Sequence, residues 1–300
     1  MRLAYNMSAQ GEEASVVVVD IDSEAMKRYG DWPWDRTLTA ELLSAVDRRT
    51  PSVIGVGIVF PERSRPESDQ QLVRAINQAS KVVLGYVGAG SREAGWLVQE
   101  TRARWGFLEL ELGDDGRVLG VRQREGKEGM ERAFAVVVAG VIEPERAEDA
   151  VRSQGVLRPN FLAARRIIRH VSAARILSNQ TAEGFHGKAV VISSDIGPIR
   201  PLTTIGRIRT SDLYAILIQN TLDRSWLRFA RGLNVFLCIV MAVAVSILRP
   251  QWLVIAVASM VYLLTSYGFW MPRGVVTSTV SVVGTMILAV GTTWGIVGRS

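Results

Sequence analysis

Three long uncharged runs in the last quarter of the chain constrain its fold more than any other feature. The charged residues from position 231 to the C-terminus are only Arg231, Arg249, Arg273 and Arg299. They separate runs of 17, 23 and 25 residues. A helix needs roughly 17–25 apolar residues to cross the hydrocarbon core of a membrane. The runs therefore predict membrane-spanning helices at about residues 230–248, 252–271 and 275–297.

The alternative for these runs is a buried helical hairpin with one further core helix. A water-soluble domain rarely contains three uncharged runs of this length in succession, because apolar runs inside globular domains are usually shorter. We therefore favour a membrane protein, with a transmembrane region over residues 225–300 and a folded domain over residues 1–224.

The charge distribution argues against nucleic-acid binding. The net charge is +6, but residues 225–300 hold five arginines and no acidic residue. Residues 1–224 therefore carry 30 Lys and Arg against 29 Asp and Glu, without the clustered excess that a phosphate backbone requires. The only cysteine, Cys238, lies in the first uncharged run, which excludes an intrachain disulfide and a cysteine-based metal cluster.

The first 224 residues alternate between β-branched runs and amphipathic segments. This pattern predicts a three-layer α/β domain with a mainly parallel central sheet and one antiparallel hairpin around residues 113–115. Residues 88–104 are expected to be loop with a short helix, and residues 143–159 to be polar and loop-like. The expected strands are 16–22, 53–60, 81–87 and 188–193, and the expected helices are 23–29, 37–48, 69–79, 131–142, 171–177 and 210–222. The last helix leads toward the first uncharged run with only a few residues between, a stiff connection suited to transmitting a displacement.

Three aspartates follow or end the predicted strands. Ligands of open parallel sheets bind outside the carboxyl ends of the strands, which are the ends that carry Asp20, Asp22 and Asp195. Paired carboxylates there are suited to Mg²⁺ or to a phosphate-bearing ligand held through the metal. The alternative is that Asp22 and Asp195 cap turns by accepting hydrogen bonds from backbone N–H groups.

Two tryptophans flank a proline shortly after the first strand. Trp32 and Trp34 around Pro33 are placed either to stack on a ligand or to cover an edge of the core, and packing is the commoner use. The two histidines, His170 and His186, have no acid or cysteine at ligand spacing, so we predict no metal site from them. No phosphate-binding loop and no nucleophile motif is present.

Several stretches resemble the CHASE type 2 domain, a sensory module found outside the membrane in bacterial cyclases and sensor kinases. The specific part is an acidic strand end followed by Gly-x-Trp-Pro-Trp-x-Arg, which here ends at Arg36. Three membrane spans after the domain are also the family's arrangement. The matching stretches are residues 16–43, 53–60, 69–84, 105–118 and 185–204.

The sequence departs from the family pattern at two internal positions. Gly57 stands where the family usually has Asp at the end of the second strand, and residues 210–215 replace a Gly-x-x-x-His-Ala-like element. The resemblance also implies a membrane span before the domain and a catalytic output domain after the third span. Because neither is found in residues 1–300, we expect the output to lie on another chain or the chain to be truncated.

The resemblance and the arginine distribution imply opposite membrane topologies. The family places the domain outside the cytoplasm. More of the arginines near the runs lie on the domain's side, which by the positive-inside rule favours the cytoplasm. A first span translocated before the later loops would override that bias. We therefore expect a multi-pass protein of the bacterial inner membrane with a periplasmic or extracellular domain.

The resulting functional prediction is a sensory or ligand-binding module without catalysis of its own, cofactor or metal. Its expected partners are the lipid bilayer, an unidentified small-molecule or protein stimulus, and a second copy or a separate output chain. Two alternatives stay open, namely a Mg²⁺-dependent phosphotransfer or hydrolytic enzyme and a purely structural membrane partner. The candidate ligand-binding residues are Asp20, Asp22, Trp32, Trp34, Arg36 and Asp195.

Overall fold

The chain divides into two compact units, Met1–Arg224 and Ser225–Ser300. Most described residues belong to the first unit, which contains the central sheet. The computed structural model describes residues 14–87, 95–122, 124–126, 129–152, 156–161, 168–180, 184–194, 200–229, 262 and 275–276.

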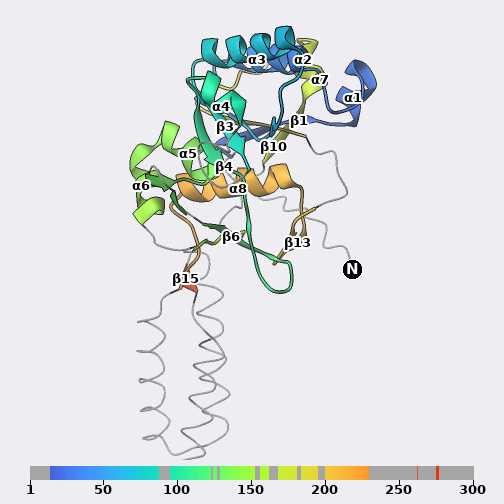
Figure 1. The fold of residues 1–300 in the computed structure, drawn as a ribbon. Coiled ribbons are helices and arrows are strands. Elements are labelled where there is room, and N and C mark those ends of the chain that lie inside the picture. Colours follow the sequence, from blue (N-terminus) through green and yellow to red (C-terminus); the bar gives the residue numbers. More distant parts are fainter. Residues whose placement is uncertain are drawn as a thin grey trace, which may run out of the picture. The chain divides into compact units, whose positions relative to one another are not determined.

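A sheet of six parallel strands forms the middle of the first unit (Figure 1). Its order is β10-β1-β11-β2-β3-β4, so strands that are distant in sequence lie side by side. The central strands are runs of β-branched residues buried on both faces, as expected for a sheet covered on both sides. The strands are β1 (Val16–Ile21), β2 (Val53–Val56), β3 (Val82–Tyr86), β4 (Arg104–Phe107), β10 (Arg169–Ser172) and β11 (Ala189–Ser194).

One face of the sheet is covered by five helices that share a single hydrophobic core with it. Val17, Val19 and Ile21 of β1 face this core, because side chains alternate between the two faces of a strand. Leu42, Leu43 and other apolar residues of the helices complete the core. The helices are α1 (Ser23–Tyr29), α2 (Arg36–Asp47), α3 (Pro66–Gln78), α4 (Trp96–Glu100) and α7 (Ala173–Leu177).

The opposite face is covered by α5 (Phe134–Ile142) and α8 (Thr210–Leu222), with α6 (Pro144–Arg152) against them. Two glycines let α5 lie directly on the sheet. A Cβ at Gly106 would come within 2.6 Å of the Phe134 Cα, and one at Gly55 within 2.8 Å of the Phe134 ring. The unit is therefore a three-layer α/β sandwich with a parallel sheet, as the sequence predicted (Figure 1).

The predicted hairpin is present, but it belongs to a separate small sheet. β5 (Glu111–Leu112) pairs antiparallel with β6 (Val118–Arg122) across the turn at Gly113, and β9 (Val156–Leu157) pairs with β6. The remaining small strands in this unit form two further pairs, β7 (Arg124–Gly126) with β8 (Gly129–Glu131) and β12 (Leu202–Thr203) with β13 (Gly206–Arg207).

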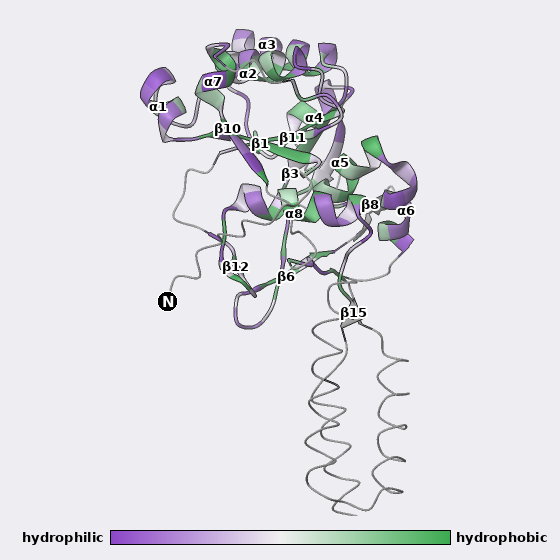
Figure 2. Ribbon diagram, turned by 180° about the vertical axis from the view of Figure 1, so that it is seen from behind, coloured by the Kyte–Doolittle hydropathy of each residue, from purple (hydrophilic) through white to green (hydrophobic). Residues whose placement is uncertain are grey.

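Several sequence predictions need correction. The helix expected over 131–142 begins at Phe134, because Glu131 ends β8. The helix expected over 171–177 begins two residues later, because Arg169–Ser172 form the edge strand β10. The segment 143–159, expected to be mainly loop, contains α6 and β9. The strand expected over 53–60 ends at Val56. β10 carries an arginine and a histidine, and Figure 2 draws it largely in hydrophilic colours, so it lacked the apolar run that revealed β11.

In the second unit, the described residues form a short parallel pair of β14 (Arg228–Phe229) and β15 (Val275–Val276). Of the helices in the described part of the chain, none combines the length and the apolar composition that crossing a membrane requires. The three predicted membrane spans lie outside the described residues, apart from Tyr262 and the two residues of β15.

Candidate functional site

The carboxyl ends of the parallel strands meet at one edge of the sheet, where the sequence predicted a site. β1 ends at Ile21 and β10 at Ser172, and Asp20 pairs in register with Ser172. The structure therefore brings Asp20 and Asp22 to this edge. Asp195 directly follows β11 but lies outside the described residues.

Asp20 is the centre of a group of charged side chains that the sequence did not reveal. Its carboxylate is 2% exposed, and Oδ2 lies 2.6 Å from Nδ1 of His170 on β10. The other ring nitrogen of His170, Nε2, lies 2.8 Å from Oδ1 of Asp212 in the first turn of α8. Arg209 Nη1 lies 3.5 Å from Asp20 Oδ2. We call Asp20, His170, Arg209 and Asp212 the His170 cluster.

The two carboxylates raise the pKa of His170 to about 9. The hydrogen bond to Asp20 contributes most, followed by that to Asp212, while partial burial opposes both. The ring is therefore a cation at neutral pH, with its Nδ1–H hydrogen-bonded to Asp20 and its Nε2 within ion-pair distance of Asp212. An imidazolium held in this way links β1, β10 and α8, and it has no lone pair with which to act as a base or a metal ligand.

The cluster escaped sequence reasoning because its members are far apart in the chain. His170 and Asp20 are separated by 150 residues. They meet because β10 and β1 are parallel neighbours in which Val18 pairs with His170, so that both side chains project from the same face as Asp20. Recognising the contact from sequence would have required the strand β10 and its register.

Asp22 has a structural role. It is the N-cap of α1, and its Oδ1 accepts a hydrogen bond from the backbone N–H of Ala25 at 2.9 Å. The same oxygen accepts a hydrogen bond from Ser172 Oγ at 2.8 Å. Capping is the alternative that the sequence left open for Asp22.

The two tryptophans pack against the core. Trp34 is 6% exposed, its Nε1–H donates to the Gly30 carbonyl at 2.8 Å, and its ring meets Tyr29 edge-on at 6.1 Å between centroids. Trp32 is half-buried at 6.2 Å from Trp34 and contacts the same core. These contacts show that the two tryptophans cover an edge of the core. Their stacking on a ligand stays a prediction.

Arg36 belongs to a second group of charges, near the end of β2. Its Nε lies 2.7 Å from Oδ1 of Asp69 on α3, and its guanidinium lies over the rings of Phe60 and Trp96 at 5.3 and 5.6 Å. The preceding Asp35 caps α2 and pairs with Arg65, whose hydrogen bond lowers the pKa of the Asp35 carboxyl below its usual value. Arg36 thus ties α2 to α3 and to α4.

The described residues do not fit a metal. No group of three or more His, Cys, Asp or Glu side chains in this part of the chain is arranged to hold a metal ion. Asp20 is already neutralised by His170 and Arg209, and Asp22 is engaged by Ala25 and Ser172. The charge of Asp20 is therefore already balanced, and one carboxylate oxygen of Asp22 is committed to the cap of α1 and to Ser172.

Comparisons with known proteins identify the family. No curated protein and no solved structure matches the chain. The model of the CHASE2 domain family matches residues 1–271. This range includes the whole α/β unit, the first uncharged run and nearly all of the second. The chain belongs to the CHASE2 domain family, a family of extracytoplasmic sensory domains.

Proposed function

We propose that the chain is a membrane-anchored extracytoplasmic sensory module of a bacterial signalling receptor, without catalysis of its own. The family match carries this proposal, because it extends from the α/β unit into the uncharged runs of residues 225–271. Because the family model includes both parts, it supports a protein in which a folded domain is joined to a membrane anchor. Its output domain would belong to another chain or to a longer form of this one.

Helix α8 is the element through which the module would signal. The His170 cluster fixes its first turn to β1 and β10, and near its other end Gln219 Oε1 accepts a hydrogen bond from the backbone N–H of Ser15 at 3.0 Å. The helix therefore runs antiparallel to β1 and is held at both ends. It ends at Leu222, eight residues before the first predicted membrane span, so a shift of α8 would reach the anchor through a short connection.

A stimulus would act by favouring one position of α8 over another. A ligand shifts such an equilibrium only by the difference in its affinity for the two states. We propose that the ligand binds near Asp20, Asp22, Trp32, Trp34 and Arg36, with Asp195 as a further expected contact, and that it competes with His170 for the Asp20 carboxylate. Dimerisation through the glycines of the third uncharged run, Gly274, Gly284, Gly291 and Gly295, would bring two such modules together.

Cysteine labelling tests the topology. In a Cys238→Ala background, the exposed Lys27 on α1 is changed to Cys, and intact cells are treated with a membrane-impermeant maleimide. We expect Lys27→Cys to react before lysis and a matched Ser300→Cys variant to react only after lysis. The reverse pattern would place the domain in the cytoplasm and would contradict the proposal.

Hydrogen exchange tests the role of α8. In the full chain in lipid nanodiscs, His170→Gln should speed amide exchange in α8, because the imidazolium no longer joins its first turn to Asp20. Arg175→Gln on α7 is the matched control, since Arg175 is an exposed cation whose ion pair with Glu24 is long, at 3.7 Å. Equal exchange rates in α8 for both variants would contradict the role of the His170 cluster in fixing the first turn of this helix.

A further inference from the structure

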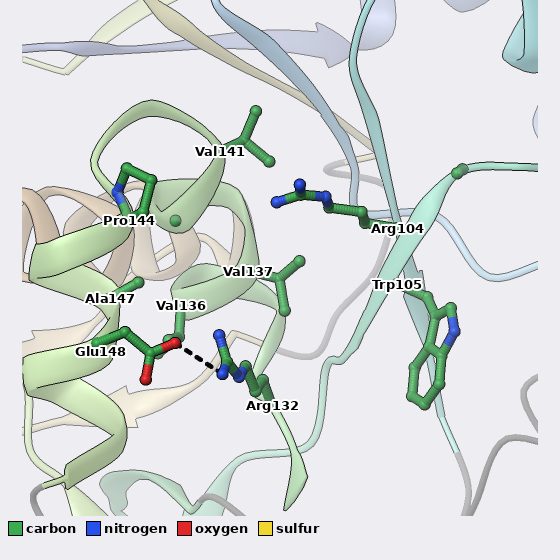
Figure 3. A pocket seen from close by; sticks show the side chains of 11 residues that line it. Arg104, Trp105, Arg132, Val136, Val137, Val141, Pro144, Ala147 and Glu148 are labelled. Atoms are coloured by element: carbon green, nitrogen blue, oxygen red, sulfur yellow. Dashed lines mark hydrogen bonds and ion pairs between the residues drawn. The ribbon is translucent and has the colours of Figure 1, made fainter.

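A pocket of about 550 Å³ lies beside the edge strand β4, away from the carboxyl-end edge of the sheet (Figure 3). It is walled by β4 on one side and by α5 and α6 on the other. Its volume is within the range of roughly 300–1,000 Å³ that small-molecule sites occupy. Of its lining residues, the argument below uses Arg104, Arg132, Val137, Val141, Pro144 and Glu148.

The charges around the pocket are predominantly positive. Arg104 and Arg132 face the pocket together with one acid, Glu148, and that acid already pairs with Arg132 at 2.8 Å. A second pocket of about 430 Å³ shares Arg104 and adds Lys81 and Arg102. The two pockets together are therefore lined by four cations and by one carboxylate that is already paired.

Arg104 is the cation available to a ligand. Its side chain is exposed and reaches from β4 toward α5 and α6 (Figure 3). Within the described part of the chain, no acidic side chain forms an ion pair with it. A guanidinium presents a planar fork of N–H donors that matches the two oxygens of a carboxylate.

Apart from the Arg132–Glu148 ion pair, the opposite wall is apolar. Val137 and Val141 of α5 and Pro144 of α6 face the pocket, and Val137 and Val141 are half-buried rather than enclosed in the core. An inorganic anion would leave these side chains uncovered, and an uncharged apolar molecule would leave Arg104 without a partner. A ligand that satisfies both walls has an anionic head and a short apolar chain.

We propose that this pocket binds a small aliphatic carboxylate, with its head on Arg104 and its chain against Val137 and Val141. The site is separate from the carboxyl-end edge, and binding there does not depend on the membrane topology. That such a ligand is a stimulus of the sensory module rests on the function proposed above.

Isothermal titration calorimetry of the full chain in nanodiscs tests the site, with hexanoate as the probe and empty nanodiscs as the blank. We expect saturable binding of hexanoate that weakens at least about tenfold in Arg104→Gln, the loss expected when one charged hydrogen-bonded contact is removed. The matched control is Arg74→Gln on α3, an exposed arginine outside both pockets that should leave the affinity unchanged.

Two further probes separate the head from the chain. Acetate lacks the apolar chain and hexanamide lacks the charge, so each should bind at least about tenfold more weakly than hexanoate. Hexanoate binding that is absent, or that is equal in Arg104→Gln and the native chain, would overturn the proposal. Binding of acetate or inorganic phosphate as tight as that of hexanoate would overturn the amphipathic specificity. Because the heat reports binding alone, a failed topology experiment would leave this result standing.

Discussion

The His170 cluster and the pocket beside β4 both contain charged side chains, but those of the cluster are paired and partly buried, whereas Arg104 in the pocket is exposed. In the cluster, two carboxylates and two cations meet within 3.5 Å, and Asp20 is buried. In the pocket, Arg104 is exposed and forms no ion pair with an acidic side chain of the described residues. The first arrangement holds elements of the fold together, and the second leaves a charge for an external partner.

The contrast qualifies the rule that ligands of parallel sheets bind at the carboxyl ends of the strands. That rule describes where loops and helix N-termini converge, and here it correctly located a concentration of charge at Asp20 and Asp22. Because His170 and Arg209 pair with Asp20, and neutral donors hydrogen-bond to Asp22, the same edge also holds elements of the fold together. A ligand bound at this edge, as proposed above, would have to displace His170, whereas Arg104 beside the start of β4 has no acidic ion-pair partner among the described residues.

The largest expected effect is the loss of the buried carboxylate of the cluster. Asp20→Asn leaves the His170 and Arg209 cations without their shared partner, and we expect the free energy of unfolding to fall by about 3 kcal/mol. Urea unfolding of the full chain in nanodiscs, followed by circular dichroism, measures this change. The exposed Asp31→Asn is the control and should stay within about 0.5 kcal/mol of the native chain. Equal values for both variants would mean that the cluster does not clamp the fold.

The next effect concerns the wall of the pocket. Gly106→Ala places a Cβ within 2.6 Å of the Phe134 backbone, so α5 must move away from β4, at a cost of about 2 kcal/mol. The same urea experiment measures the cost, and hexanoate binding should weaken with it. Gly184→Ala, where a Cβ meets nothing within 4 Å, serves as the control. A native-like Gly106→Ala variant would contradict the close contact of α5 with the sheet.

The pH dependence of stability reports the His170 cluster directly. Because the folded-state pKa is raised to about 9 from 6.5, the stabilisation is fully present below pH 6.5 and is lost as pH rises through about 9. Allowing for solvent screening of this partly exposed ring, we expect a loss of about 1–2 kcal/mol. Unfolding free energies of the native chain and of His170→Gln, compared from pH 6 to 10, should converge at high pH. Parallel curves would be inconsistent with a folded-state imidazolium.

Removing the charge of the pocket should have almost no effect on stability. Arg104→Gln is expected to change the free energy of unfolding by less than about 0.5 kcal/mol, because the exposed guanidinium forms no ion pair with an acid of the described residues. Urea unfolding beside Asp20→Asn makes the comparison. A loss similar to that of Asp20→Asn would show that Arg104 is part of the structure and would end the distinction between the two regions.

The smallest expected effect is that of Mg²⁺. A ligand that does not bind the native state does not raise its stability, so millimolar Mg²⁺ should leave the thermal midpoint of the full chain unchanged. Calcium at the same concentration controls for ionic strength. A rise specific to Mg²⁺ that disappears in Asp22→Ala would instead favour the Mg²⁺-dependent enzyme, with Asp195 as a further ligand.

The sequence predicted those parts of the fold whose pattern is local. Helix α8 has the predicted bounds, Thr210–Leu222, and β1 and β11 were recognised because both are runs of buried β-branched residues. The strand β10 was missed because two of its four residues, Arg169 and His170, are charged or titratable. Charged residues of an edge strand pair with side chains that are distant in sequence, so no local sequence pattern identifies such a strand.

For the candidate site, the sequence placed Asp20, Asp22 and Arg36 near the ends of strands but did not reveal what each one contacts. The packing of Trp34 and the capping by Asp22 were open alternatives, because the same residue types serve ligands and folds. The structure shows the packing and capping contacts through the distances to Gly30 and Ala25, while ligand binding by these residues stays a prediction.

The sequence by itself determined the three-layer class of the domain, the uncharged runs after it and the resemblance to its family, since all three depend on the order of residues along the chain. Only the tertiary structure decided that His170 joins Asp20 to Asp212 and that Arg104 faces a pocket. The reason is physical: an ion pair depends on the distance in space between two charges, and strand order and register set that distance across 150 residues of chain.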